Sequence, residues 1–470
     1  MLRTVLLALA LAAPLPALAQ DALVLTPDQM RAAAVAALQA GDAGAAEQFA
    51  RALLARDPDD PVAHRILAEL AIAAGDATAL RAQAAALWRS APTLAARYEA
   101  ARMGAFAATQ EDRLTLAQFW LRRAMTVAPD ADALRQTVSD FRAVRERNPL
   151  SLEFGLAVSP SDNVNGGSDV DYIRVDGEIV CLEIGGVCIF PMSPSAIDRA
   201  YSGWSYAPSL ALSYRLRADA TSQTRATFQA GGRGVLLSDA ALAELEGQDH
   251  DGEPIDNETF SSWQIRAGID HQIARPDGSL TLSATLGRDW ARGERSEDNL
   301  SLGLGRVLTL NESEALIFGL SHEWHLDADP GEADQIRDVL RLGHVRALDN
   351  GGRLRFDLSL TDARSDNYQK DFDRVGLTAS LSLPPPLPGV RLDTRAGVTW
   401  TNFPTYQFFD PVPGGRSDIA VSVGADITFD RWSWAGFSPQ VQLSAERTDS
   451  NINQFESEGV TVGFALVSTF

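Results

Sequence analysis

Hydrophobic and polar residues alternate with a period of two over the C-terminal two thirds of the chain. Within residues 150–158, every even position is Leu, Phe or Val, and every odd position is small, polar or charged. Successive side chains of a strand point to opposite faces. The pattern therefore predicts strands that have one apolar face and one polar face.

This alternation recurs in about fourteen segments, each about 10 to 15 residues long, whereas an ordinary strand has about five or six residues. The segments begin near residues 150, 203, 224, 259, 279, 298, 313, 335, 353, 372, 389, 416, 434 and 457. An even number of long strands is typical of bacterial barrels that cross a membrane with tilted strands.

A soluble sandwich would show the same alternation, but three observations favour a membrane barrel: the strands are long, aromatic residues lie near the strand ends, and the last residue is Phe470. Arg355 and Arg395 lie mid-strand opposite runs of Leu and Val. A charge facing lipid would cost about 2 to 4 kcal/mol, so both are expected in a polar lumen. We therefore predict a 14-stranded antiparallel transmembrane β-barrel over residues 150–470. Aromatic residues also gather near the predicted strand ends, as in interfacial girdles: Trp263, Trp290, Trp324, Trp400, Phe403, Phe429, Trp432 and Trp434.

The predicted connections alternate between short turns and longer polar loops. Short connections with turn residues include 275–278, 349–352 and 384–389. Bacterial barrels place short turns on the periplasmic side and long loops outside. The segment before the first strand is therefore expected in the periplasm. The longer connections are 160–202, 238–258, 291–297, 326–334, 364–371, 402–415 and 448–456.

The last predicted strand, residues 459–470, is expected to close the barrel. One face is apolar, and the other is small or polar. Bacterial outer-membrane barrels commonly end in such a strand with a final aromatic residue. Because an open sheet edge does not occur in lipid, this strand should pair with residues 150–158. Its apolar residues are Val460, Val462, Phe464, Leu466 and Phe470.

Residues 20–149 have a different character, since they are rich in Ala, Leu and Arg with helical periodicity. The dipeptide Gly-Asp at 41–42 recurs at 75–76, which is 34 residues later (75 − 41). That period predicts tetratricopeptide-like helical hairpins. A third, irregular unit follows, and a final helix at about 133–147 would cap the stack.

Two roles fit this helical domain. Stacked hairpins expose a concave groove that binds peptides. Alternatively, the domain is a short helical spacer, and its aromatic residues Trp88, Phe119 and Trp120 pack in its hydrophobic core.

The sequence also indicates export. Residues 1–19 are expected to be a secretory signal peptide, with Arg3 before an apolar run and a small-x-small cleavage site.

Cys181 and Cys188 are the only cysteines. A local disulfide is expected in an oxidising compartment. The alternative is a metal pair, but no further Cys and no nearby His completes a site. The net charge of −21 argues against nucleic acid as a partner.

No catalytic constellation marks the chain as an enzyme, and no cofactor or metal site is expected. His322 and His325 flank Glu-Trp, but a zinc protease carries its two His four residues apart on a helix. On a strand, these two would point to opposite faces. Residues 162–167 resemble part of a calcium loop but lack the acidic ligand that should follow.

The chain resembles one family, the surface lipoprotein assembly modulators (Slam). The resemblance covers nearly all of the mature chain and rests first on the domain order. It rests also on Asn-Pro-Leu-Ser-Leu-Glu-Phe-Gly at 148–155, on Ser-Asp-Asn-Val-Asn at 161–165, and on Arg447 with Ser-Asn-Ile at 450–452. It implies an outer-membrane translocator of a Gram-negative bacterium that delivers client lipoproteins or related secreted proteins to the cell surface. Periplasmic chaperones and barrel-assembly machinery are expected partners beside the lipid bilayer.

Two other functions fit the same features. A lumen with mixed Arg and Asp residues suits a passive porin-like channel for small solutes that carries a periplasmic helical domain. A barrel scaffold or adhesin would use the loop at 160–202 as its contact surface.

Overall fold

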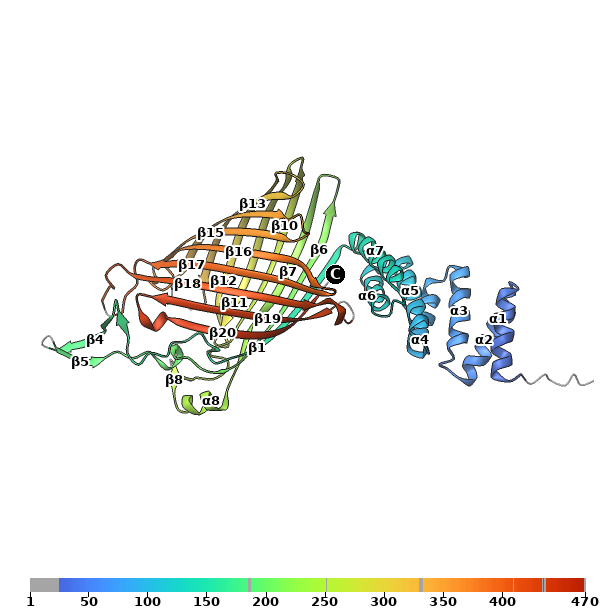
Figure 1. Cartoon of the computed structure of the whole chain (residues 1–470), viewed down its shortest axis with the longest axis horizontal. Helices are drawn as coiled ribbons and strands as arrows, with labels where there is room; N and C mark the ends of the chain where they lie inside the picture. The colour runs from blue at the N-terminus through green and yellow to red at the C-terminus, as the bar shows by residue number, and fades with distance from the viewer. Residues whose placement is uncertain are drawn as a thin grey trace, which may run out of the picture. The chain divides into compact units, whose positions relative to one another are not determined.

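A computed structural model describes residues 25–468, apart from 185–186, 251, 329–332, 409, 433 and 435–436. The expected signal peptide and Phe470 therefore lie outside the described residues. The described chain consists of helices followed by a closed barrel (Figure 1). It forms two compact units, and the boundary between them along the chain lies between Arg113 and Leu114. This boundary lies within the helical segment, so its last two helices belong to the same unit as the barrel.

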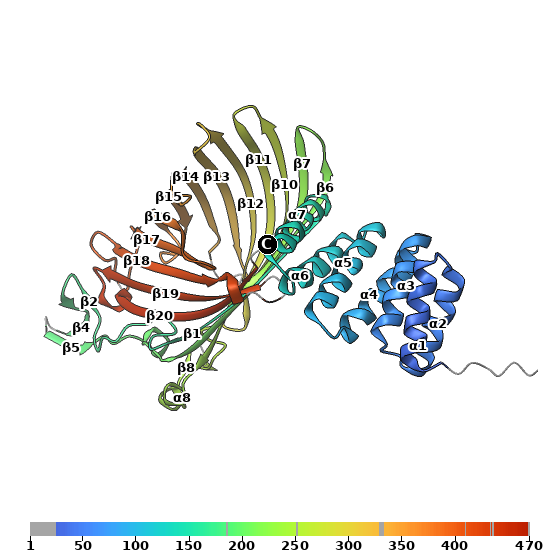
Figure 2. The same ribbon diagram turned by 45° about the vertical axis from the view of Figure 1, so that its right-hand side comes forward.

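The helices of the N-terminal segment are connected by short turns (Figure 2). Gly41 and Gly75 take φ angles of 78° and 68°, a left-handed conformation that suits Gly and ends a helix. The Asp that follows each Gly then caps the next helix by accepting a hydrogen bond from its backbone. The Gly-Asp repeat thus builds the turn inside each hairpin. The helices are α1 (Pro27–Gln39), α2 (Ala43–Arg56), α3 (Pro61–Ala74), α4 (Ala77–Ser90), α5 (Leu94–Gln110), α6 (Leu114–Thr126) and α7 (Ala131–Arg147). None of the described helices is long and apolar enough to cross a bilayer.

Asp60 joins two of these helices, and its loss should destabilise the helical unit. The fully buried carboxylate caps α3 by accepting from the backbone N–H groups of Val62 and Ala63, and it also accepts from Arg31 Nε of α1 at 2.8 Å. Asp60→Ala is expected to cost about 2 to 4 kcal/mol, because a cap and a charged hydrogen bond are lost together. Thermal unfolding followed by far-ultraviolet circular dichroism measures this. Asp28→Ala removes an exposed carboxylate from the same arginine and should cost under about 1 kcal/mol. Equal losses of unfolding free energy for the two variants would contradict the role of Asp60 in joining α1 to α3.

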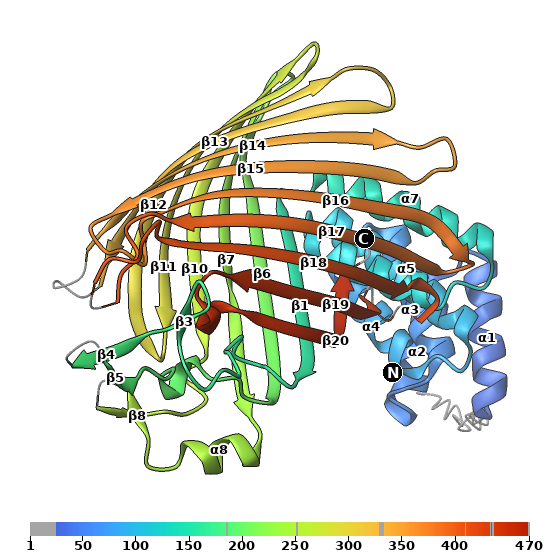
Figure 3. The ribbon, with the colours of Figure 1, turned by 60° about the vertical axis from the view of Figure 1, so that its left-hand side comes forward.

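The strands after α7 form one closed antiparallel barrel (Figures 1 and 3). The ring order is β1-β20-β19-β18-β17-β16-β15-β14-β13-β12-β11-β10-β7-β6, which returns to β1. The 14-stranded barrel is thus confirmed, and β20 is the neighbour of β1. The barrel strands are β1 (Leu150–Ser161), β6 (Gly203–Ala218), β7 (Ser222–Leu237), β10 (Ser262–Arg275), β11 (Gly278–Ala291), β12 (Glu294–Thr309), β13 (Glu314–Asp327), β14 (Gln335–Ala347), β15 (Arg353–Ser365), β16 (Phe372–Leu387), β17 (Val390–Phe403), β18 (Arg416–Phe429), β19 (Phe437–Ser450) and β20 (Ser457–Ser468).

The two faces of the wall follow the sequence alternation. Leu358 of β15, Leu377 of β16 and Val398 of β17 lie side by side in register on the outer face. Their neighbours along each strand point inward, where Arg355 and Arg395 lie as expected. On β20, Val460, Val462, Phe464 and Leu466 are all exposed on the outer face. The wall therefore has an apolar outside for lipid and a polar inside.

Small elements outside the wall lie in the loops between strands. The connection from β1 to β6 contains β2 (Arg174–Val175), β3 (Glu178–Ile179), β4 (Cys181–Ile184), β5 (Val187–Pro191) and η1 (Ala196–Asp198). The connection from β7 to β10 contains α8 (Asp239–Leu245), β8 (Asp249–His250) and β9 (Glu253–Pro254). The short helices η2 (Asp430–Trp432) and η3 (Asn453–Phe455) follow β18 and β19.

Three expectations about strand ends are corrected. The connection at 291–297 is a tight turn, because Arg292 and Gly293 both take positive φ and the polar residues that follow belong to β12. The prolines at 384–386 lie within β16, where the register shifts between Leu383 and Leu387. Proline lacks the N–H that the ladder needs, yet it fits an extended backbone. Phe403 is not on the outer girdle, since it points inward and is 7% exposed.

Candidate functional site

The inner face of the wall divides into two arcs of opposite charge. The wall from β11 to β13 directs the carboxylates Asp289, Glu297, Glu323 and Asp327 inward. The wall from β14 to β18 carries arginines at inward positions, namely Arg337, Arg341, Arg353, Arg355, Arg374, Arg391, Arg395 and Arg416. These arcs create a transverse field in the lumen.

Ion pairs with aspartates neutralise only part of the arginine arc. Arg355 donates from Nε and Nη2 to the two carboxylate oxygens of Asp357, Arg395 binds Asp426 at 2.8 Å, and Arg416 binds Asp418 at 2.6 Å. Arg374, by contrast, donates to the neutral hydroxyl of Thr401. Arg391 pairs with Asp430 at 2.8 Å, so four of the eight arginines of this arc have an aspartate partner and the arc keeps a basic character.

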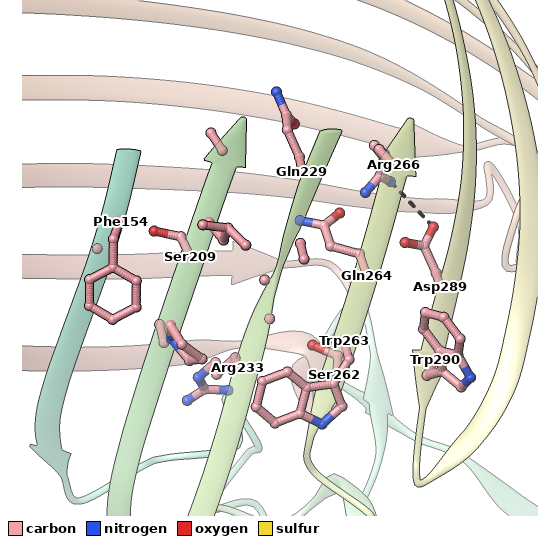
Figure 4. A pocket seen from close by; sticks show the side chains of 18 of the residues that line it. Phe154, Ser209, Gln229, Arg233, Ser262, Trp263, Gln264, Arg266, Asp289 and Trp290 are labelled. Carbon is pink, nitrogen blue, oxygen red and sulfur yellow. Dashed lines mark hydrogen bonds and ion pairs between the residues drawn. The ribbon is translucent and has the colours of Figure 1, made fainter. Parts of the chain in front are cut away.

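A recess of about 1270 Å³ lies along the wall from β1 to β11. Figure 4 shows Gln229 of β7, Gln264 and Arg266 of β10, and Asp289 of β11 at this recess, with the Arg266–Asp289 ion pair of 3.3 Å. Arg145 of α7 also lines it. Polar and apolar side chains line this recess in about equal measure, so its chemistry alone selects no single class of ligand.

The first long loop, residues 162–202, packs on β7 at one side of the barrel mouth. Val164 and Tyr201 of the loop form a buried cluster with Val235, an inward residue of β7, and with Leu245 of α8. Arg233 of β7 donates to the Val164 carbonyl. Burial raises the pKa of the Tyr201 phenol, whose hydroxyl donates to the Ala196 carbonyl. The loop is therefore fixed to the inner side of this wall.

The same loop packs on the opposite side of the mouth as well. Ile173 is buried in a second cluster with Phe372 of β16, Phe403 of β17 and Tyr406. β16 and β7 lie on opposite sides of the ring of strands. Loop residues 165–167 and 197–198 also line a cavity of about 480 Å³ against inward residues of β16 to β19. The loop thus crosses the mouth of the barrel inside the ring of strands.

Arginine side chains stack on the aromatic residues of the second cluster. The Arg416 guanidinium lies 3.3 Å from the ring centroid of Phe455 and 4.5 Å from that of Phe403, and Arg374 lies 4.7 Å from that of Phe372. Such cation–π contacts stabilise a positive charge against a partly apolar surface. Burial raises the pKa of Tyr406 to about 12, so its phenol stays neutral. The site was missed by sequence reasoning, because no local spacing signals contacts between distant loops.

Cys181 and Cys188 form the expected disulfide, at the β4–β5 hairpin. This hairpin extends beyond the ends of the barrel strands (Figure 1). Leu182, Ile189 and Phe190 of the hairpin are exposed. The disulfide therefore closes a hairpin at the tip of the loop, away from the part that crosses the mouth.

The two histidines lie on opposite faces of β13, as expected. His325 points inward, is 5% exposed and hydrogen-bonds Glu297 and Glu323 through its two ring nitrogens at 2.7 and 3.2 Å. His322 points outward beside Asp338. Residues 162–167 form a closed turn, in which Asn163 bonds both the N–H and the carbonyl of Gly167. This turn directs the chain from β1 into the mouth.

The helix pair α6–α7 is attached to the short-turn end of the barrel. Arg215 of β6 donates to the carbonyls of Glu146 and Arg147 at 3.0 and 2.9 Å, which satisfies the last carbonyls of α7. Asn148 caps α7 and accepts from Leu150 N, the first residue of β1. Arg122 of α6 stacks on Phe437 of β19. The helices are thus fixed to the wall on both sides of β1.

The N-terminal compact unit offers a separate groove of about 660 Å³ between α2, α3 and α4. Its floor includes Leu67 and Leu70, and its rim includes Glu47 and Arg51. An apolar floor with charged edges suits a peptide.

The chain has distant similarities to solved structures. The chain is similar to an outer-membrane channel from Pseudomonas putida F1, with 12% identity, a TM-score of 0.33, and coverage of 68% of this chain and 96% of that chain. A FadL homologue from Pseudomonas aeruginosa has 11% identity and a TM-score of 0.37, and the similarity covers 68% of this chain and 91% of the homologue. Acinetobacter baumannii OccAB4 has 9% identity to this chain and a TM-score of 0.32, and the similarity covers 67% of this chain and 98% of OccAB4. No protein-family model and no curated protein matches the chain.

Proposed function

We propose that this chain is an outer-membrane translocator that delivers client lipoproteins, or related secreted proteins, to the cell surface. The observation that carries the proposal is the attachment of a helical-hairpin segment to the barrel entrance. Arg215 and Asn148 bond α7 to the wall where β1 begins. A pore for simple diffusion needs no such domain. The groove between α2, α3 and α4 gives the helical segment a surface for a polypeptide.

Protease shaving of intact cells tests this function. An epitope-tagged surface lipoprotein encoded beside this gene is expressed to equal levels with and without the chain. Export by this chain predicts that protease removes the tag only where the chain is present. A variant lacking residues 20–113, which include the described first compact unit, should keep a folded barrel and lose most of the exposure. Equal exposure with and without the chain would refute the proposal.

The divided charge of the lumen favours a second candidate function, a channel for small charged solutes. Carboxylates on β11–β13 and arginines on β14–β18 would orient a solute that bears both charges. Planar-bilayer recording tests this. A channel function predicts a high conductance that does not change when residues 20–113 are removed, together with no effect of the chain on lipoprotein exposure.

A further inference from the structure

The seam between β1 and β20 is much shorter than the other seams of the barrel. β1 pairs with β6 along its whole length, from Leu150↔Tyr214 to Ser161↔Gly203. With β20, it pairs only over Leu156–Val158 and Phe464–Leu466, which is three residue pairs. β20 pairs with β19 from Ser457 to Ser468. The outer part of β20, residues 457–463, therefore has a partner on one side only.

The course of β1 explains this open edge. Continuing the observed register would place Pro160 opposite Val462. Pro160 has no N–H to give to a ladder. β1 ends one residue later, and the turn closed by Asn163 and Gly167 then leads the chain into the mouth. β1 thus leaves β20 before β20 ends.

An unpaired strand edge at this height of the wall requires a partner. Every second residue of an edge directs its N–H and C=O toward the missing strand, and lipid offers them no hydrogen bond. Val460 is 71% exposed, the largest value among the apolar outward residues Val460, Val462, Phe464 and Leu466 of β20. On the lumen side, Gly459 has open space where a Cβ would lie. The edge is accessible both from the lumen and from outside.

We propose that residues 457–463 of β20 form a docking edge for an extended segment of the translocated client. The proposal rests on the function proposed above. A segment with alternating side chains would pair with this edge, place apolar side chains beside Val460 and Val462, and place small or polar ones beside Thr461. Next to this edge, on the side of the short turns, Val158 of β1 pairs with Phe464 of β20. The site therefore admits one extended polypeptide strand. The wall of a second barrel would first have to displace β1.

Site-specific photocrosslinking tests the docking edge. The variant Thr461→p-benzoylphenylalanine carries the photoreactive group on the lumen side of the edge. The matched control is Ser422→p-benzoylphenylalanine, at an inward position of β18 that is paired on both sides, with Gly397 and Glu446. The probe is the tagged lipoprotein of the shaving experiment. We expect at least tenfold more crosslinked lipoprotein from position 461 than from position 422.

A disulfide across the seam tests whether the edge must open. The ideal Cβ of Gly463 lies 3.5 Å from the Ser159 Cβ, within the range of a disulfide. Ser159→Cys with Gly463→Cys should reduce lipoprotein exposure several-fold when oxidised, and reductant should restore it. Gly397→Cys with Ser422→Cys, at paired positions within the wall, should have no such effect.

Three outcomes would overturn the docking edge while leaving translocation intact. These are equal crosslinking at both positions, crosslinking of position 461 only to a second copy of this chain, and full exposure through the oxidised seam. Each is measured in cells whose lipoprotein exposure depends on this chain. If exposure does not depend on the chain at all, the translocator function fails first, and the docking edge fails with it.

Discussion

Leu377→Arg is expected to destabilise the barrel by about 2 to 4 kcal/mol, because it places a charge in the apolar outer belt. Leu377 lies near the middle of β16, with Leu358 and Val398 beside it, and is 48% exposed on the outer face. In a bilayer, lipid covers that surface. The measurement is the folded fraction in lipid vesicles at increasing urea concentration, read from the slower gel migration of unfolded barrels.

Thr378→Arg is the matched control for this substitution. Residue 378 is the next position along β16, points inward, and lies beside Asp357 and Gly397. A new cation there meets water and a carboxylate, so it should cost less than about 1 kcal/mol. Equal destabilisation by the two substitutions would contradict the assignment of faces, and with it the membrane-spanning barrel.

The same alternation explains how much of the wall was predictable from sequence. A period of two is a local property, so Arg355 and Arg395 were placed in the lumen from their immediate neighbours alone. The pairing of β1 with β20 also followed, because a barrel in lipid leaves no alternative neighbour for its two end strands. The Gly-Asp turns at 41–42 and 75–76 were recognisable for the same reason, since caps depend on adjacent residues.

The mouth of the barrel was not predictable, because its contacts join residues far apart in sequence. The alternation along β17 places Phe403 on the inward face with Arg395, but nothing near it in sequence indicates that its ring meets Ile173. Arg233 bonds a carbonyl 69 residues away, at Val164. The length of the seam was equally hidden, since it depends on where β1 leaves the wall and not on its alternation. Local patterns specify strands and faces, whereas loop docking depends on the closed ring that those strands create.

Removing the part of the loop that crosses the mouth is expected to raise the single-channel conductance roughly twofold or more, because pore width limits the current. The variant replaces residues 168–198 with a short Gly linker. The cut ends are already close, since Asn165 Nδ2 donates to the Arg199 carbonyl at 2.5 Å. The deletion removes Ile173 and Ile197, which contact opposite sides of the mouth. Planar-bilayer recording of the purified protein gives the comparison.

Removing only residues 182–190, with a Gly-Gly link, is the matched control for the loop deletion. Cys181 and Pro191 are already paired, so the shortened hairpin closes without strain on its base. The lost tip includes the exposed residues Leu182 and Phe190 but leaves Ile173 in its cluster. Conductance should therefore stay at the level of the unaltered chain. An equal rise in both variants would place the constriction at the hairpin, and no rise in either would mean that the loop does not limit the pore.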